Sequence, residues 1–379
     1  MRVVRTAGVI VSGLSLAAFG LAACGNDDTG NTGTGAQAET AVTVVASTNV
    51  WADIARHVGG DAVTIETLIS DPAIDPHHYE STPSDVATVQ DASLVVFNGG
   101  GYDQFVQDIL ESTTPAPRSV NAYEILVNHG TVHHDDDHHD DDHHDEDGHG
   151  AGEGEHGATE QHESGSEADH HHDEGDDHGA EGAHGAGGHE DADGHGHGHG
   201  HDHSGANEHV WYDFHIVSDV AHAIARELSE LDPDNADTYQ ANADETAERI
   251  EELEDRAGEV RETTEGIDVA QTEPLTEYLL EELGITDIAP FEFTTAVEHG
   301  TDPSAAVTAQ FTDLLTDGSA QALIYNAQTE SPTTQQMRTI AAENDVPVIE
   351  VTESLPAGMD YFEWMHSILD EFERVLSEV

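Results

Sequence analysis

One long segment of this chain cannot contribute to a hydrophobic core. Residues 129–208 consist mainly of His, Asp, Glu and Gly, and large apolar side chains are almost absent from them. Because this composition buries too little apolar surface to offset the chain entropy lost on folding, we expect the segment to be disordered. The folded part must therefore be assembled from the two flanking stretches, which are long enough for two lobes of ordinary size.

The same segment has the composition of a weak metal binder with many sites. Twenty-one histidines lie between His129 and His203, as pairs, a triplet and an alternating Gly-His run. Imidazole is a good ligand for Zn²⁺, Ni²⁺ and Cu²⁺. Since a flexible chain loses entropy when it gathers ligands, we predict several weak sites. A solvated acidic linker with incidental histidines, or an expression tag inside the chain, explains this density less well.

Both flanking stretches alternate strand patterns with helix patterns, which is typical of the α/β fold class. Uninterrupted apolar runs such as 93–98 suit a parallel sheet covered on both faces. We predict strands at 41–47, 63–69, 93–98, 266–270, 322–326 and 346–351. We predict helices at 49–58, 83–91, 103–112, 213–265 with a break at Asp232-Pro233, and 361–378, with two more opening at Pro274 and Pro332.

The beginning of the chain has the features of a secreted lipoprotein. Two arginines precede an apolar run at residues 7–23, which is short for a membrane span. The Leu-Ala-Ala-Cys sequence ending at Cys24, the single cysteine, resembles a bacterial lipobox, and an ordinary secretory peptide is the alternative. The predicted divisions are a signal peptide (1–23), a lipidated flexible tether (24–40), an N-terminal α/β lobe (41–128), the disordered insertion (129–208), the end of the N-terminal lobe (209–235), a linking helix (236–265) and a C-terminal α/β lobe (266–379).

The charge of the chain excludes some partners. It has 79 acidic residues against 10 basic ones, all arginine, for a formal charge of -69. Such a chain is not attracted electrostatically to nucleic acid or to an anionic membrane. Outside 129–208 there are still 54 acidic residues, so we hypothesise an adaptation to high salt, where counterions screen the repulsion. Unfolding at low ionic strength, with recovery in molar salt, would support this hypothesis.

A histidine pair lies where α/β folds bind ligands. His77 and His78 follow the strand at 63–69 and precede the helix at 83–91, so they lie at the carboxyl end of a strand. A lone histidine is usually structural, and His78 is the neighbouring alternative to His77. Asp75 has two equal explanations, because it can orient an imidazole or cap the turn.

The Asp-Pro-His turn at 75–77 resembles the metal-site signature of the zinc/manganese solute-binding proteins of ABC transporters, the family often called cluster A-I. In that family the histidine after Asp-Pro is a metal ligand, which would be His77. A second element, with His209 and Trp211, resembles the family's His-x-Trp-x-Asp, whose histidine is the second ligand. The resemblance covers nearly all of the chain after residue 40. It implies two α/β lobes joined by a long rigid helix, with a metal site in the cleft between them.

The resemblance also points to carboxylate ligands in the second half of the chain. Glu273, at a strand-to-helix corner, matches the position that holds His in many zinc importers and Glu in many manganese importers. Glu330 has the same local pattern, but the family usually has Asp near there, so the fourth ligand stays open among Glu330, Gln328 and Asn326. We take the remaining histidines outside the insertion to be structural or exposed: His57, His215, His222, His299 and His366.

These observations predict a lipoprotein, anchored to the outer face of a bacterial cell membrane, that captures a divalent cation and delivers it to an ABC permease. We expect a monomer without enzymatic activity. Glu273 favours Mn²⁺ and the histidine-rich segment favours Zn²⁺, and we choose Zn²⁺ with Mn²⁺ as the alternative. A surface adhesin or metal store would leave the two lobes unexplained. A zinc hydrolase would need an open ligand position and a base, and the sequence has no His-Glu-x-x-His element.

Overall fold

The computed structural model describes residues 42–132, 206–377 and 379. These residues belong to one compact unit that begins at Ala41. The predicted signal peptide, the lipidation at Cys24, the tether and nearly all of the histidine-rich insertion lie outside the described residues. Within the described part, no helix is both long enough and apolar enough to cross a membrane.

The first sheet is built from the residues before the insertion. Its four strands run parallel in the order β2-β1-β3-β4. Every residue of β3 is buried, as expected for a strand covered on both faces. The strands are β1 (Val42–Thr48), β2 (Val63–Ile69), β3 (Leu94–Phe97) and β4 (Arg118–Asn121). The helices between and after them are α1 (Asn49–Gly59), α2 (Pro83–Asp91), α3 (Gln104–Ser112) and α4 (Ala122–Val132).

The second sheet repeats this arrangement near the end of the chain. Its strands are also parallel, in the order β6-β5-β7-β8. The central strand β7 is wholly buried. The strands are β5 (Asp268–Gln271), β6 (Thr286–Asp287), β7 (Ala322–Asn326) and β8 (Val348–Val351). Its helices are α7 (Glu277–Glu282), α8 (Phe291–Glu298), α9 (Ala305–Thr316), α10 (Pro332–Glu343) and α11 (Tyr361–Leu376).

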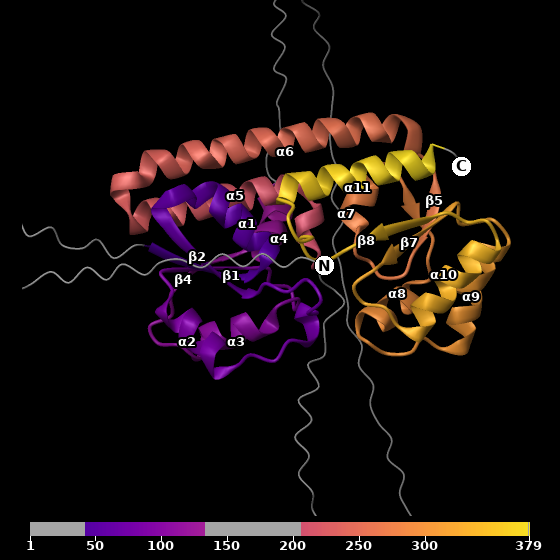
Figure 1. Cartoon of the computed structure of the whole chain (residues 1–379), viewed down its shortest axis with the longest axis horizontal. Helices are drawn as coiled ribbons and strands as arrows, with labels where there is room; N and C mark the ends of the chain where they lie inside the picture. Colours follow the sequence, from indigo (N-terminus) through magenta and orange to yellow (C-terminus); the bar gives the residue numbers. More distant parts are fainter. Residues whose placement is uncertain (1–41, 133–205, 378) are drawn as a thin grey trace, which may run out of the picture. The chain divides into compact units, whose positions relative to one another are not determined.

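Helix α6 (Ala236–Thr264) connects the lobes. Helix α5 (Phe214–Leu231) packs against α6, which has 29 residues and is therefore about 43 Å long. Helix α6 also contacts α1 and α11 and passes along both sheets (Figure 1). Its buried residues recur every three or four positions, as one face of a helix should: Tyr239, Ala243, Thr246, Ile250, Leu253, Ala257, Val260 and Thr264.

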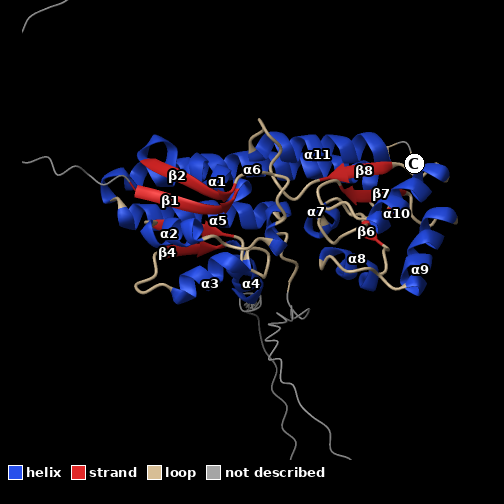
Figure 2. Cartoon of the chain, turned by 60° about the horizontal axis from the view of Figure 1, so that its bottom comes forward, coloured by secondary structure: helices blue, strands red, loops and turns tan. Residues whose placement is uncertain are grey.

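One hydrophobic cluster runs through both lobes. It includes Val44 of β1, Leu253 of α6, Ile324 of β7 and Phe372 of α11. Because these residues share a core, the two sheets are fixed to a common helical layer. Figure 2 shows the strands as two separate groups with helices beside each of them. The predicted fold class, two α/β lobes with sheets flanked by helices, is confirmed.

The described residues extend into the predicted insertion at both of its ends. Helix α4 continues to Val132, so His129 lies on a helix. The described chain resumes at Ala206, ahead of the expected return at residue 209. The predicted domain boundaries all stay predictions.

Candidate metal centre

His77 is held by a short 3-10 turn. Pro76–His78 form this turn after β2, and Asp75 accepts a hydrogen bond from the backbone N–H of His77 at 2.9 Å. The second carboxylate oxygen of Asp75 lies 2.8 Å from Nδ1 of His78. The His78 side chain is 57% exposed, whereas the His77 ring packs edge-on against Tyr102 at 4.8 Å between centroids. Asp75 therefore caps the turn and pairs with His78.

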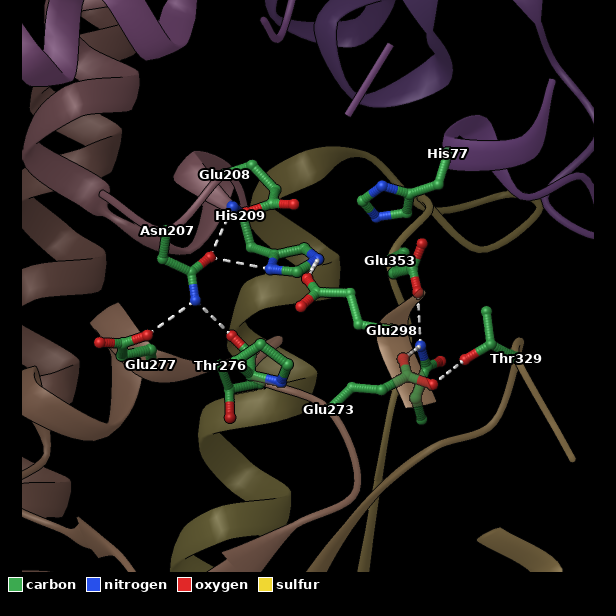
Figure 3. Close-up of polar contacts among 12 residues, drawn as sticks. His77, Asn207, Glu208, His209, Glu273, Thr276, Glu277, Glu298, Thr329 and Glu353 are labelled. Atoms are coloured by element: carbon green, nitrogen blue, oxygen red, sulfur yellow. Dashed lines mark hydrogen bonds and ion pairs between the residues drawn. The ribbon is translucent and has the colours of Figure 1, made fainter. Parts of the chain in front are cut away.

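His209 is buried with one nitrogen directed by Asn207. Only 2% of His209 is exposed, and its Nδ1 lies 2.8 Å from Oδ1 of Asn207. The amide nitrogen of Asn207 donates to Pro274 O and to Glu277, so its oxygen must face the imidazole (Figure 3). Nδ1 then carries the proton and Nε2 keeps a lone pair, as a metal ligand requires. Burial, with a smaller contribution from His77, lowers the pKa of His209 well below its usual value, so the ring is neutral.

The two imidazoles meet although they come from distant parts of the chain. Their ring centroids lie 5.9 Å apart, and both contact Tyr102. The segment of His209 is fixed to the end of β3, because Nδ2 of Asn98 donates to the carbonyl of Glu208 at 2.7 Å. Trp211 packs behind His209 at 5.2 Å between ring centroids.

Glu298, the last residue of α8, lies beside the imidazoles. Its Oε1 is 3.8 Å from Nε2 of His209. Potential ligand atoms of His77, His209 and Glu298 all lie within 4.8 Å of one another. Burial raises the pKa of Glu298 to about 9, and the charge of Glu208 adds to this effect.

Two more carboxyls lie at the carboxyl ends of strands in the second sheet. Glu353 follows β8 and Glu273 follows β5, and both are almost completely buried. The amide of Asn326 donates to both of them, each at 2.5 Å, and Thr329 donates to Glu273 (Figure 3). Glu353 also groups with Asp75 and His77, with possible ligand atoms within 4.8 Å.

The carboxyls of this cluster repel one another. Burial is the main reason that the pKa of Glu273 rises to about 7 and that of Glu353 to about 8. The charge of Glu273 then adds to the effect on Glu353. Several buried acids with raised pKa values beside the neutral imidazole of His209 are electrostatically suited to a cation, which would remove the repulsion. The donor set therefore fits a divalent metal.

The structure does not bring Glu330 to this cluster. Its side chain is 39% exposed, accepts a hydrogen bond from Tyr325 at 2.9 Å and forms an ion pair with Arg338 at 3.4 Å. Gln328 instead supports the site: its Oε1 accepts the backbone N–H groups of Glu353 and Ser354. Of the three residues left open for the fourth ligand, Asn326 is the one that touches the acids, and it does so as a donor.

Sequence reasoning missed Glu353 and Glu298. Glu353 had a usable signal, because it follows a predicted strand just as Glu273 does, and parallel strands end at the same edge of a sheet. Glu298 had none, since the end of a helix that follows a surface loop has no preferred relation to the cleft. Its position beside His209 depends on how α8 packs.

The site lies where the two halves of the chain are tied together. Asn49 and Leu355 exchange two hydrogen bonds, at 2.9 and 3.1 Å. Nε2 of Gln328 donates to Pro72 O, and the backbone N–H of Tyr361 donates to Asp53. Through the bond from Gln328 to Pro72, the loop that carries His77 is tied to the residue that supports Glu353.

Two α/β lobes on a common helical layer, with imidazoles from one and carboxyls from the other, define a two-lobed binding protein with a candidate divalent-metal centre. The family model described as the periplasmic component A of a zinc-uptake complex matches residues 44–375, and the chain belongs to this family.

Individual relatives match more locally. The chain is similar to the iron-binding protein YfeA of Yersinia pestis, with 31% identity over 77 residues, which is 20% of this chain and 24% of the relative. It is similar to the manganese ABC transporter substrate-binding lipoprotein PsaA of Streptococcus pneumoniae serotype 4, with 36% identity over 56 residues, which is 15% of this chain and 18% of the relative. The chain thus spans about a quarter or less of these relatives.

A solved structure matches almost throughout. The periplasmic zinc-binding protein TroA from Treponema pallidum superimposes with a TM-score of 0.61 over 89% of this chain and 99% of its own, at 13% sequence identity. This likeness shows a shared fold. The names of the three proteins refer to iron, manganese and zinc, so they do not indicate a single metal.

Proposed function

We propose that this protein is an extracytoplasmic lipoprotein that captures a divalent metal ion and delivers it to an ABC permease for uptake. The observation that carries this proposal is the convergence of His77 and His209 with buried carboxyls from the second sheet. Family membership supports it, because this family consists of solute-binding components of transporters and not of enzymes. The lipid anchor at Cys24 remains part of the proposal, and the names of several relatives include the word lipoprotein.

We assign the ligands to Nε2 of His209, an imidazole nitrogen of His77, and the carboxylates of Glu273 and Glu353. Glu273 and Glu353 are oriented by hydrogen bonds from Asn326, as ligating carboxylates usually are. Glu298 lies 3.8 Å from Nε2 of His209 and groups with both imidazoles, so it is the alternative carboxylate ligand. Glu330 is replaced in this assignment, because it is paired with Arg338.

We favour Zn²⁺ as the cargo and keep Mn²⁺ as the alternative. Two imidazoles with two carboxylates satisfy a four-coordinate zinc, and Zn²⁺ lies far above Mn²⁺ in the usual affinity order. The two carboxylates make the site harder, which would favour Mn²⁺. The names of the relatives allow either ion.

The test uses Trp211 as a local reporter in the full-length protein. This indole packs on His209, and residues 129–208 contain no tryptophan, so metal bound by the histidine-rich segment gives little change in emission. Titration with Zn²⁺ and with Mn²⁺ should give a one-site transition that is lost in His77→Ala, with tighter binding of Zn²⁺. A Trp211→Phe variant identifies the source of the signal. An unchanged transition in His77→Ala would refute the proposed site.

A further inference from the structure

A second group of metal-ligating side chains lies where α4 packs on α5. It consists of His129 near the end of α4, and His215 and Asp219 in the first turns of α5. Possible ligand atoms of all three lie within 4.8 Å of one another. Nδ1 of His129 is 3.0 Å from Oδ2 of Asp219, and the two imidazole centroids are 4.7 Å apart at an interplanar angle of 71°.

The fold brings these residues together by two simple features. His215 and Asp219 are four residues apart on α5, so they project from the same face of the helix. Helix α4 packs along α5 and supplies His129. His215 was expected to be structural or exposed; it is exposed, and in addition a histidine of another helix lies against it.

The surroundings of this group are acidic. Asp213, the N-cap of α5, is close enough to both imidazoles for their charges to lower its pKa, although burial outweighs them and raises it overall. His215 also acts to lower the pKa of Glu254 of α6, although burial raises that pKa overall. Arg261 lines the same pocket as His215 and Glu254. Its guanidinium donates to the carbonyl of Glu282 at 3.1 Å and lies 3.6 Å from Glu265. A cation between the imidazoles would therefore meet a negative potential.

We propose that His129, His215 and Asp219 form a second divalent-metal site, for an imidazole-preferring ion such as Zn²⁺. Two imidazoles and one carboxylate provide three ligands, and water completes the shell. Tetrahedral zinc requires ligand atoms about 3.3 Å apart, so modest side-chain rotations convert the present group into a coordination shell. His215 is exposed, so the ion exchanges readily with solvent.

The site lies where the histidine-rich segment leaves the folded lobe, because His129 is the first histidine of that segment and lies on α4. Metal bound there would join the last turn of α4 to α5. The ion pair between His129 and Asp219 already joins the two helices, but it needs neither zinc nor His215. Protection that depends on both zinc and His215 therefore distinguishes a metal site from this ion pair.

The test is amide hydrogen exchange of the α4 peptide, residues 122–132, in the full-length protein with and without Zn²⁺. At a zinc concentration ten times the dissociation constant of the site, exchange near the end of α4 should slow roughly tenfold. The slowing should disappear in His215→Ala and in Asp219→Asn. It should persist in His77→Ala, which separates this site from the buried cluster and from the transport proposal.

His222→Ala is the matched control. His222 lies on the same helix and pairs with Asp244 at 3.3 Å, outside the three-residue group. Zinc should protect α4 in this variant as it does in the unmodified chain. Equal protection in His215→Ala, or no protection in the unmodified chain, would overturn the second site and leave an ion pair only.

Discussion

Two regions of this molecule bring a pair of imidazoles to carboxylates, and they differ in burial. The cluster around His209 is enclosed, with Glu273 and Glu353 inside the protein. The group around His215 lies at the surface between α4 and α5. Because the acids of the first region are buried, their negative charges repel one another strongly. A cation bound there removes this repulsion. The surface group has water as an alternative partner, so we expect weaker binding and faster exchange there.

The largest expected effect is the loss of an imidazole from the buried cluster. His77→Ala should weaken zinc binding, measured by the emission of Trp211, by more than about 100-fold, which exceeds the usual cost of losing a supporting residue. The fold should survive, because His77 lies in a short turn before α2. His78→Ala is the control, and it should change affinity by less than about threefold, since His78 is exposed and pairs with Asp75.

The proposed carboxylate ligands give the next effect in size. Glu353→Gln and Glu273→Gln should each lower zinc affinity by about 10- to 100-fold. Glu330→Gln should leave it within about threefold, because Glu330 is paired with Arg338 at the surface. If Glu330→Gln weakened binding as much as Glu353→Gln, the assignment of the fourth ligand would be wrong. Glu298→Gln should have an intermediate effect.

A pH series distinguishes the enclosed acids from exposed ones. Glu273, Glu353 and Glu298 have pKa values raised to about 7, 8 and 9 from the ordinary 4.5. The metal-free folded protein therefore keeps protons that the unfolded chain loses, and its free energy of unfolding should decrease as pH rises from about 5 to 9. Bound metal stabilises the ionised carboxylates and so opposes this decrease in stability. The zinc-induced rise in Tm should therefore increase from about pH 5 to 9.

This pH dependence can be checked by calorimetry in the unmodified chain and in two variants. In Glu353→Gln the metal-free protein should be more stable at pH 8 by about 2 °C or more, because one buried charge is gone. In His77→Ala the zinc-induced increase in Tm should be small at every pH. In the unmodified chain, a zinc-induced rise in Tm that does not change between pH 6 and 9 would contradict the proposed role of the buried acids.

The smallest expected effect concerns the surface group. His215→Ala should leave the zinc titration followed by Trp211 within about twofold, because the two regions use different ligands. A larger change would mean that zinc binding at one site affects zinc binding at the other, so the two sites would not be independent.

The sequence predicted the fold class and the positions of two proposed ligands from local features of the chain. Apolar runs such as 93–98 became buried parallel strands. Thr82 caps α2 and Asp85 completes the capping box, as the residues around Pro83 indicate. His77 follows a strand of the first sheet and Glu273 a strand of the second, and ligands bind at the carboxyl ends of the strands in such sheets.

Three features could not be predicted, because they depend on packing between distant elements: the pairing of Glu330, the position of Glu298 and the group around His215. Glu330 and Glu273 have the same local sequence pattern, but Arg338 on the following helix neutralises Glu330. Glu298 reaches His209 only through the position of α8. His129 and His215 become neighbours only because α4 packs on α5.

The most direct measurement is anomalous diffraction at the zinc absorption edge from crystals of the zinc-loaded, full-length protein. Zinc shared by the two lobes would give its strongest peak about 2.0–2.1 Å from an imidazole nitrogen of both His77 and His209, with oxygens of Glu273 and Glu353 completing the shell. Strong zinc peaks elsewhere, with no peak between these two imidazoles, would contradict a metal centre built from both halves of the chain.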